Sequence, residues 1–214
     1  MQPLLVFDLD GTLVDSVPDL AAALNRLAAT QGLAGFDHAE VRGMIGDGIA
    51  ALLRRALAAR GRAEEPALLP GFAADYAAHC AELTRPYPGV PELLDTLQAQ
   101  GWRVALCTNK PEAATRALLA ALGLLHHFVA IGAGDTFPAR KPDPAHLGAT
   151  VAAAGGGPAI MVGDHHNDMA AAAGAGARSI WASWGYADAD PGADAVAHAP
   201  GDIPGLAMAW QPPH

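Results

Sequence analysis

Two aspartates stand almost side by side near the start of the chain, in Asp8-Leu9-Asp10-Gly11-Thr12. Gly11 permits a sharp turn, so both carboxylates can face one pocket. One carboxylate can attack phosphorus, while the other protonates the leaving oxygen and later activates water. Two negative charges at this spacing repel each other and an incoming phosphate. A cation is therefore needed, and carboxylate oxygens favour a hard one such as Mg²⁺.

A second acidic pair occurs in Gly163-Asp164-His165-His166-Asn167-Asp168. Asp164 follows an apolar run and is the better candidate for direct metal binding. Asp168, about one helical turn later, would orient the site or contribute through water. Either acid alone could instead cap a helix. His165 and His166 could bind a transition metal, but hydrogen bonding around the acids, or simple exposure, is the interpretation we favour.

Three further residues could bind phosphate oxygens. Thr108 and Asn109 follow another apolar run and can donate a hydroxyl and amides. Lys141 lies in Arg140-Lys141-Pro142-Asp143-Pro144, a loop stiffened by two prolines. Most surface lysines are merely solvated, but a fixed cation is what phosphoryl oxygens and a charged nucleophile require. We therefore predict that Thr108, Asn109 and Lys141 bind phosphate.

Apolar segments over residues 3–8, 102–107 and 159–163 have the length of buried strands and end at these polar groups. In an open parallel sheet, ligands bind beyond the carboxyl ends of the strands. Helices predicted over 90–100, 111–122, 142–154 and 167–173 alternate with these strands and with shorter ones over 128–131, 179–182 and 193–197. The pattern indicates an α/β fold with a doubly wound parallel sheet.

The segment over residues 16–82 has a different character. Helical spacing of apolar residues occurs over 18–30, 49–60 and 68–83, and no good strand interrupts it. The sequence therefore predicts two parts. Residues 1–15 and 83–214 form the core, and residues 16–82 form a small helical domain inserted into it.

Composition narrows the classes of function. The chain has 214 residues and a net charge of −9, which argues against a nucleic-acid partner. Its apolar runs are shorter than the roughly 18 residues that a membrane helix needs. The first residues lack a basic stretch, so we expect a cytoplasmic protein. Cys80 and Cys107 are too few for a disulfide framework and should be buried thiols. Monomer and homodimer both stay open.

Taken in order, these residues resemble the motifs of the haloacid dehalogenase superfamily. The aspartate motif spans Asp8 to Thr12, the hydroxyl residue is Thr108, the lysine is Lys141, and the last motif runs from Gly163 to Asp168. The resemblance covers nearly the whole chain. It implies a Rossmannoid core with a helical C1 cap.

The same resemblance implies residue roles. Asp8 would be the nucleophile and Asp10 the general acid and base. Mg²⁺ would be held by Asp8, by the main-chain carbonyl of Asp10 and by Asp164. Thr108 and Lys141 would grip the phosphoryl group. The acid at position 10 points to phosphatases rather than to the dehalogenases of the superfamily.

Within the superfamily, several strings resemble the phosphoglycolate phosphatase branch. The resemblance implies Mg²⁺-dependent hydrolysis of a small phosphate monoester through an aspartyl-phosphate, with 2-phosphoglycolate the leading candidate. It assigns Arg42 and Gly46 to substrate specificity. One departure is His165-His166, where relatives commonly have a serine. The strings are residues 42–48, Tyr87-Pro88-Gly89-Val90, Thr108-Asn109-Lys110, and Gly134-Asp135 through Lys141-Pro142.

Other functions stay open at this stage. A phosphotransferase of the β-phosphoglucomutase type would share the core and the cap position. Pyrophosphate, sugar phosphates and nucleotides are alternative substrates for hydrolysis. A non-catalytic binding protein is a remote alternative, because such proteins usually lack one of the acids or the lysine.

Overall fold

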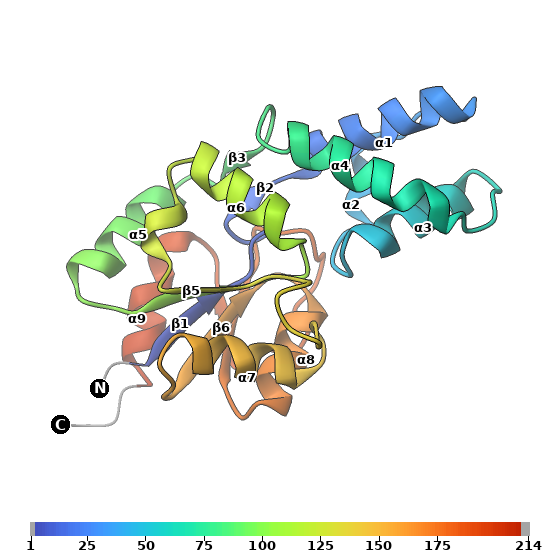
Figure 1. The fold of residues 1–214 in the computed structure, drawn as a ribbon. Helices are drawn as coiled ribbons and strands as arrows, with labels where there is room; N and C mark the ends of the chain where they lie inside the picture. Colours follow the sequence, from blue (N-terminus) through green and yellow to red (C-terminus); the bar gives the residue numbers. More distant parts are fainter. Residues whose placement is uncertain (1–2, 211–214) are drawn as a thin grey trace.

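A computed structural model describes residues 3–210 of the chain. At its centre lies a parallel sheet of six strands in the order β5-β4-β1-β6-β7-β8 (Figure 1). The predicted α/β fold is therefore confirmed. The strands are β1 Leu4–Phe7, β4 Val104–Cys107, β5 Ala130–Gly132, β6 Ala159–Gly163, β7 Arg178–Ala182 and β8 Ala195–Ala197.

The strand register brings distant residues to one edge of the sheet. Phe7 at the end of β1 pairs with Leu106 of β4 and with Val162 of β6. The residues that follow these strands, among them Asp8 and Asp164, therefore emerge at the same edge. This is the edge at which the sequence analysis expects a ligand.

Helices cover both faces of the sheet. Alternate β1 residues point to opposite faces, so Leu4 and Val6 share a cluster with Leu147 of α7, whereas Leu5 and Phe7 belong to the larger second cluster. Figure 1 shows α7 and α8 on one side and α5 on the other. The helices are α5 Val90–Ala99, α6 Glu112–Ala121, α7 Pro144–Ala153, α8 His166–Gly174 and α9 Ile203–Met208, with short 3-10 turns at Pro66–Leu68, Leu125–His127 and Pro200–Asp202.

A second group of helices lies beside this sheet (Figure 1). It consists of α1 Val17–Gln31, α2 His38–Arg42, α3 Ile49–Ala59 and α4 Leu69–His79. The chain enters through β2 Val14–Asp15 and returns through β3 Arg85–Pro86, which pair antiparallel. Strand β2 ends at the predicted boundary at 15/16, and β3 begins two residues after the predicted boundary at 82/83. The division into two domains stays a prediction, and residues 1–2 and 211–214 of the predicted core lie outside the described part.

Several elements differ from the sequence prediction, since the short strands β2 and β3 and the helices α2 and α9 were not predicted and α4 is shorter than expected. Helix α4 ends at His79 instead of continuing to residue 83. The reason is the Asp19 carboxylate of α1, which accepts hydrogen bonds from the backbone N–H of Leu83 at 3.0 Å and of Thr84 at 2.8 Å. Helix α2 was not predicted, because five residues are too few for a periodic pattern. Its capping box, Asp37 with Glu40, was the available signal.

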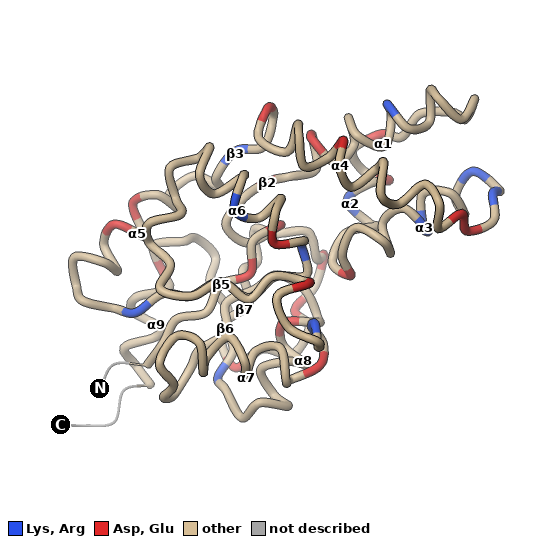
Figure 2. Tube along the Cα trace, in the orientation of Figure 1, with Lys and Arg blue, Asp and Glu red and all other residues tan. Residues whose placement is uncertain are grey.

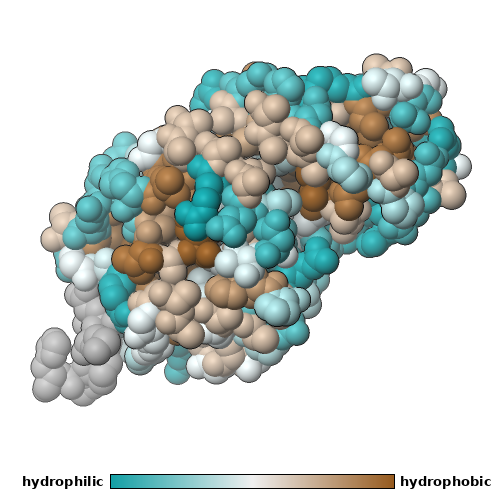
Figure 3. All heavy atoms as spheres, viewed as in Figure 1, coloured by the Kyte–Doolittle hydropathy of each residue, from teal (hydrophilic) through white to brown (hydrophobic). Residues whose placement is uncertain are grey.

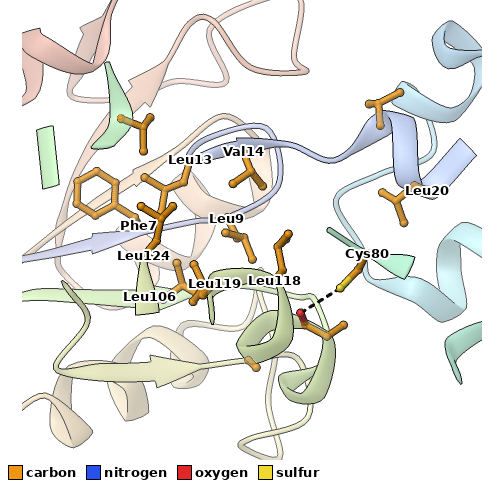
Figure 4. Close-up of a cluster of buried hydrophobic side chains, with 14 of the residues drawn as sticks. Phe7, Leu9, Leu13, Val14, Leu20, Cys80, Leu106, Leu118, Leu119 and Leu124 are labelled. Atoms are coloured by element: carbon orange, nitrogen blue, oxygen red, sulfur yellow. Dashed lines mark hydrogen bonds between the residues drawn. The ribbon is translucent and has the colours of Figure 1, made fainter. Parts of the chain in front are cut away.

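The hydrophobic core continues from the sheet into the second group of helices (Figure 4). Phe7 and Leu106 of the sheet belong to the same cluster as Leu20 of α1. The Cys80 thiol, just after α4, donates to the Ala114 carbonyl of α6 at 3.7 Å. Cys80 and Cys107 are both buried and unpaired with each other, as expected.

Figures 2 and 3 show how charged and hydrophobic residues are distributed in one view of the molecule. Lysine and arginine are few and lie scattered along the trace (Figure 2). On the face shown in Figure 3, hydrophobic residues form separate patches bordered by hydrophilic ones. Within residues 3–210, none of the helices has the length and apolar character needed to cross a membrane.

Candidate active site

Three carboxylates meet at the edge of the sheet. Asp8 follows β1, Asp164 follows β6, and Asp168 lies in the first turn of α8. One oxygen of each lies within 4.8 Å of those of the other two, and all three residues are buried. Burial raises the pKa of Asp8 to about 6, although Lys141 opposes the shift. Burial and the charge of Asp8 raise the pKa of Asp164 to about 8.

Lys141 lies between two of these acids. Its Nζ is 2.8 Å from Asp8 Oδ1 and 2.6 Å from Asp168 Oδ1. Burial works against its charge, but the attraction of Asp168 and Asp8 prevails and raises the pKa of Lys141. The Lys141 backbone N–H donates to His146 Nδ1 at 3.1 Å, and burial lowers the pKa of His146 to about 4, which keeps that nitrogen able to accept. The loop thus holds the ammonium in place.

One lysine cannot balance three buried carboxylates. The remaining negative charge, together with the raised pKa values of Asp8 and Asp164, favours either protons or a bound cation. All the groups that the cluster offers are oxygens, which suit Mg²⁺ better than a soft transition metal. The donor set therefore fits the predicted metal.

Asp164 is fixed by residues that sequence reasoning left without a role. Thr12 Oγ1 donates to Asp164 Oδ1 at 2.9 Å, and the Tyr186 backbone N–H donates to Oδ2 at 2.8 Å. Gly11 has φ +86°, and a Cβ there would lie 2.3 Å from Asp164 Oδ2. A Cβ on Gly185 would lie 2.2 Å from the Asp164 Cβ. Both glycines let the backbone approach the carboxylate.

Asp168 combines two tasks that the sequence analysis treated as alternatives. One oxygen binds Lys141, and the other accepts from the His165 backbone N–H at 3.0 Å, which completes a capping box on α8. Burial lowers the pKa of His165 to about 4, and its Nδ1 accepts from the Asn167 N–H at 3.3 Å. His166 is exposed. Neither histidine belongs to the carboxylate cluster.

Asp10 contacts a lysine that the sequence analysis quoted only as part of a resemblance. Lys110 Nζ lies 2.9 Å from Asp10 Oδ1 and 3.2 Å from Oδ2. The same Nζ donates to the hydroxyl of Tyr76, a residue of α4. Lys110 and Tyr76 are both buried. In the sequence, the feature that could have indicated this contact is the position of Lys110 directly after Thr108-Asn109.

Thr108 and Asn109 lie where the sequence analysis expects them, at the end of β4. Thr108 is buried, and its hydroxyl accepts from the Lys110 backbone N–H at 3.3 Å. The Asn109 side-chain amide donates to the carbonyls of Gly46 and Lys141, each at 2.9 Å. These two bonds leave the amide committed to neighbouring loops. Phosphate binding by Asn109 stays a prediction, and it would fall to the backbone.

The loop before α3 contacts the core at the same place. Gly46 has φ +121°, and a Cβ there would lie 2.6 Å from His165 Nε2. Asn167 Nδ2 donates to the Gly46 carbonyl at 3.2 Å and to Asp47 Oδ1 at 2.8 Å. Arg42 is exposed, with its guanidinium 5.7 Å from the centre of the Tyr186 ring. The specificity roles of Gly46 and Arg42 stay predictions.

A pocket opens between the strand ends and the second group of helices. Asp8, Asp10, Thr108 and Asp164 line its polar end, and Gly46 and Tyr186 also contribute. Leu20 of α1, Ile49 and Leu52 of α3, and Ile45 of the loop before α3 form an aliphatic part of the lining. Arg42 does not line the pocket, although Tyr186 beneath it does. The pocket combines a concentrated polar site with a small apolar compartment.

Comparisons with known proteins identify the family of the chain. Residues 3–176 match the family of haloacid dehalogenase-like hydrolases. A phosphoglycolate phosphatase of Cereibacter sphaeroides is 49% identical over 188 residues, 86% of each chain. One from Caulobacter vibrioides is 43% identical over 210 residues, 94% of this chain and 88% of the relative.

Solved structures agree as well. A predicted phosphoglycolate phosphatase from Haemophilus somnus superimposes with a TM-score of 0.87 at 30% identity, over 96% of this chain and 97% of that one. The sequence match and the shared fold both indicate the same protein family. The chain belongs to the haloacid dehalogenase-like hydrolases.

Proposed function

We propose that the protein is a Mg²⁺-dependent phosphatase that cleaves a small phosphate monoester through an aspartyl-phosphate, with 2-phosphoglycolate as the leading substrate. The observation that carries the proposal is the Asp8 carboxylate, buried 2.8 Å from Lys141 Nζ at the polar end of the pocket. A carboxylate and a phosphate dianion repel each other. A fixed cation beside the carboxylate weakens this repulsion, so the two groups can approach.

In the first step an Asp8 oxygen attacks phosphorus, and the bond from phosphorus to the leaving oxygen breaks. Lys141 can offset the negative charge of the phosphoryl oxygens, because its ammonium already lies against Asp8. The Thr108 hydroxyl, at the end of β4, can donate to the same oxygens. Asp168 would keep Lys141 in place through the 2.6 Å contact.

Asp10 supplies the proton chemistry. Its carboxyl proton would pass to the leaving oxygen, and the resulting carboxylate would then take a proton from the water that attacks the aspartyl-phosphate. Both acids line the same pocket, as this sequence of steps requires. One residue thereby serves as acid and base in turn.

Asp8, the main-chain carbonyl of Asp10, and Asp164 would hold the metal. A bound Mg²⁺ supplies positive charge that the carboxylate cluster lacks and so favours the phosphate dianion beside Asp8. Thr12 and the Tyr186 N–H orient the Asp164 oxygens toward this task. Asp168 already binds a cation, the Lys141 ammonium, and its other oxygen accepts from the His165 N–H, whereas the partners of Asp164 are uncharged; this supports an orienting role for Asp168.

Two observations support a small acid as substrate. Relatives that are 43–49% identical are named phosphoglycolate phosphatase. Leu20, Ile45, Ile49 and Leu52 line part of the pocket, so sugar hydroxyls that faced these side chains would be left without partners. Arg42 stays a predicted specificity residue: it does not line the pocket, but its guanidinium lies 5.7 Å from the ring of Tyr186, which does. A cytoplasmic location also stays part of the proposal.

The test is a panel of phosphate esters with Mg²⁺, comparing the wild type with Asp8→Asn and Asp10→Ala. We expect phosphate release to be fastest from 2-phosphoglycolate and to be abolished by each substitution. An isomerised sugar phosphate instead of free phosphate would favour the phosphotransferase. Faster release from pyrophosphate, sugar phosphates or nucleotides would replace the substrate. No turnover of any ester would favour a binding protein, and near-normal turnover by Asp8→Asn would refute the nucleophile.

A further inference from the structure

Lys110 is a buried cation that the proposed chemistry does not use. Its ammonium faces both Asp10 oxygens, at 2.9 and 3.2 Å, and 5% of the residue is exposed. Burial by itself disfavours the ammonium, but the attraction of Asp10 prevails and raises the pKa of Lys110. The ammonium is therefore held against Asp10 and largely away from water.

The contact fixes the direction of the Asp10 carboxylate. Two nearly equal distances to one nitrogen place the ammonium across both oxygens, so rotation of the carboxylate breaks at least one contact. Only 3% of the Lys110 side chain and 12% of the Asp10 side chain are exposed, so water competes little for this contact. A general acid and base depends on such geometry, because its proton must lie within hydrogen-bond reach of the reacting oxygen.

Lys110 is in turn held by α4, one of the helices over the pocket. Its Nζ donates to the Tyr76 hydroxyl and lies 4.6 Å from the centre of the Tyr76 ring. Tyr76 is 1% exposed, so both contacts are shielded from water. A cation near the face of an aromatic ring is attracted by it, and this attraction strengthens when the pair is desolvated.

We propose that Lys110 is the positioning residue for the general acid and base Asp10, and that Tyr76 fixes Lys110 from α4. The chain of contacts links a helix over the pocket to the residue that transfers the proton. Lys110 and Lys141 then have separate tasks, since Lys141 contacts Asp8 and Lys110 contacts Asp10. The inference rests on the proposed phosphatase function.

The proposed reaction uses Asp10 in each of its two half-reactions. In the first, phosphorus moves from the leaving oxygen to Asp8, and the leaving oxygen takes the Asp10 proton. In the second, Asp10 takes a proton from water, whose oxygen forms the new bond to phosphorus as the bond to Asp8 breaks. An alkyl ester needs Asp10 in both steps, whereas p-nitrophenyl phosphate needs it only in the second, because nitrophenolate leaves without a proton.

The experiment compares these two ester types in Lys110→Met and the milder Tyr76→Phe, which keeps the ring and removes only the hydroxyl. For an alkyl phosphate we expect Lys110→Met to lower kcat about 100-fold with KM changed less than about 3-fold. With p-nitrophenyl phosphate it should release a rapid burst of about one nitrophenol per active site before a slow steady rate. Tyr76→Phe should lower kcat about 10-fold. Lys110→Arg, which keeps a cation, should recover part of the loss.

Arg116→Met is the matched control, because it removes an exposed cation of α6 that pairs only with Glu112 among the residues described. It should leave both esters unaffected, and thermal melting should show that every variant is folded. Equal slowing of both esters without a burst, or an unchanged kcat in Lys110→Met and Tyr76→Phe, would overturn this inference while the proposed function stands. A wild type that hydrolyses neither ester would overturn both.

Discussion

Replacing Lys141 with methionine should destabilise the protein by an amount that depends on pH. Methionine keeps the length of the side chain and removes its charge. The substitution leaves Asp8 and Asp168 buried, each without the ammonium that now lies 2.8 or 2.6 Å away. Removing one partner from a buried ion pair typically costs about 3–5 kcal/mol.

Protonation sets the pH dependence. The pKa of Asp8 is raised to about 6 even beside Lys141, so without the lysine this carboxyl takes up a proton more readily on folding. A group that binds protons more tightly in the folded state stabilises it as pH falls. We therefore expect the loss to be about 3–5 kcal/mol near pH 8 and only about 1–2 kcal/mol near pH 5.

The assay is urea unfolding, followed by tryptophan fluorescence and with Mg²⁺ removed by a chelator. In a separate thermal melt near pH 8, the same loss of stability should lower the melting temperature of Lys141→Met by about 6–20 °C for a chain of this length. Lys141→Arg keeps the charge and should lose less. A loss in Lys141→Met below about 1 kcal/mol, or one that is equal at both pH values, would refute the assignment of Lys141 as the counter-charge of the cluster.

Three more predictions concern the metal and two glycines. Without Mg²⁺, the free energy of unfolding should fall as pH rises from about 4 to 8, because the raised pKa of Asp164 lets the folded state bind a proton that the unfolded state releases. Added Mg²⁺ should therefore raise the melting temperature more at about pH 9 than at about pH 6. Equal shifts at the two pH values would contradict this prediction. Gly46→Ala, with its Cβ 2.6 Å from His165, should lower kcat/KM about 10-fold, whereas Gly43→Ala, whose Cβ meets its nearest atom at 3.7 Å, should change it less than about 2-fold. Gly11→Ala should cost about 1–3 kcal/mol in thermal unfolding, because its φ is +86° and its Cβ would meet Asp164; an unchanged melting temperature would contradict this.

The acids and the sheet were predictable because each follows from a short, local sequence pattern. Each buried strand is a short apolar run, and Asp8 and Asp164 follow such runs directly. Parallel strands then bring their ends together without further information. Lys141 was recognisable from its prolines and from the charge that the acids require.

The contacts of the loop that follows β4 had no such local signal in the sequence. Tyr76 meets Lys110 from 34 positions away, and its place on α4 is that of any buried aromatic residue. The side chain of Asn109 could equally have faced a phosphate, but the carbonyls of Gly46 and Lys141 take its amide. These outcomes depend on how the helices lie over the strand ends, which local patterns do not specify.

The most direct test of the account is the detection of phosphate on Asp8. The wild type is mixed with Mg²⁺ and 2-phosphoglycolate, quenched with acid within milliseconds, digested, and analysed by mass spectrometry. We predict one phosphoryl group on the peptide that contains Asp8, and none on the corresponding peptide of Asp8→Asn. Phosphate release by the wild type with no modified Asp8 peptide at any quench time, together with undiminished release by Asp8→Asn, would contradict the central claim.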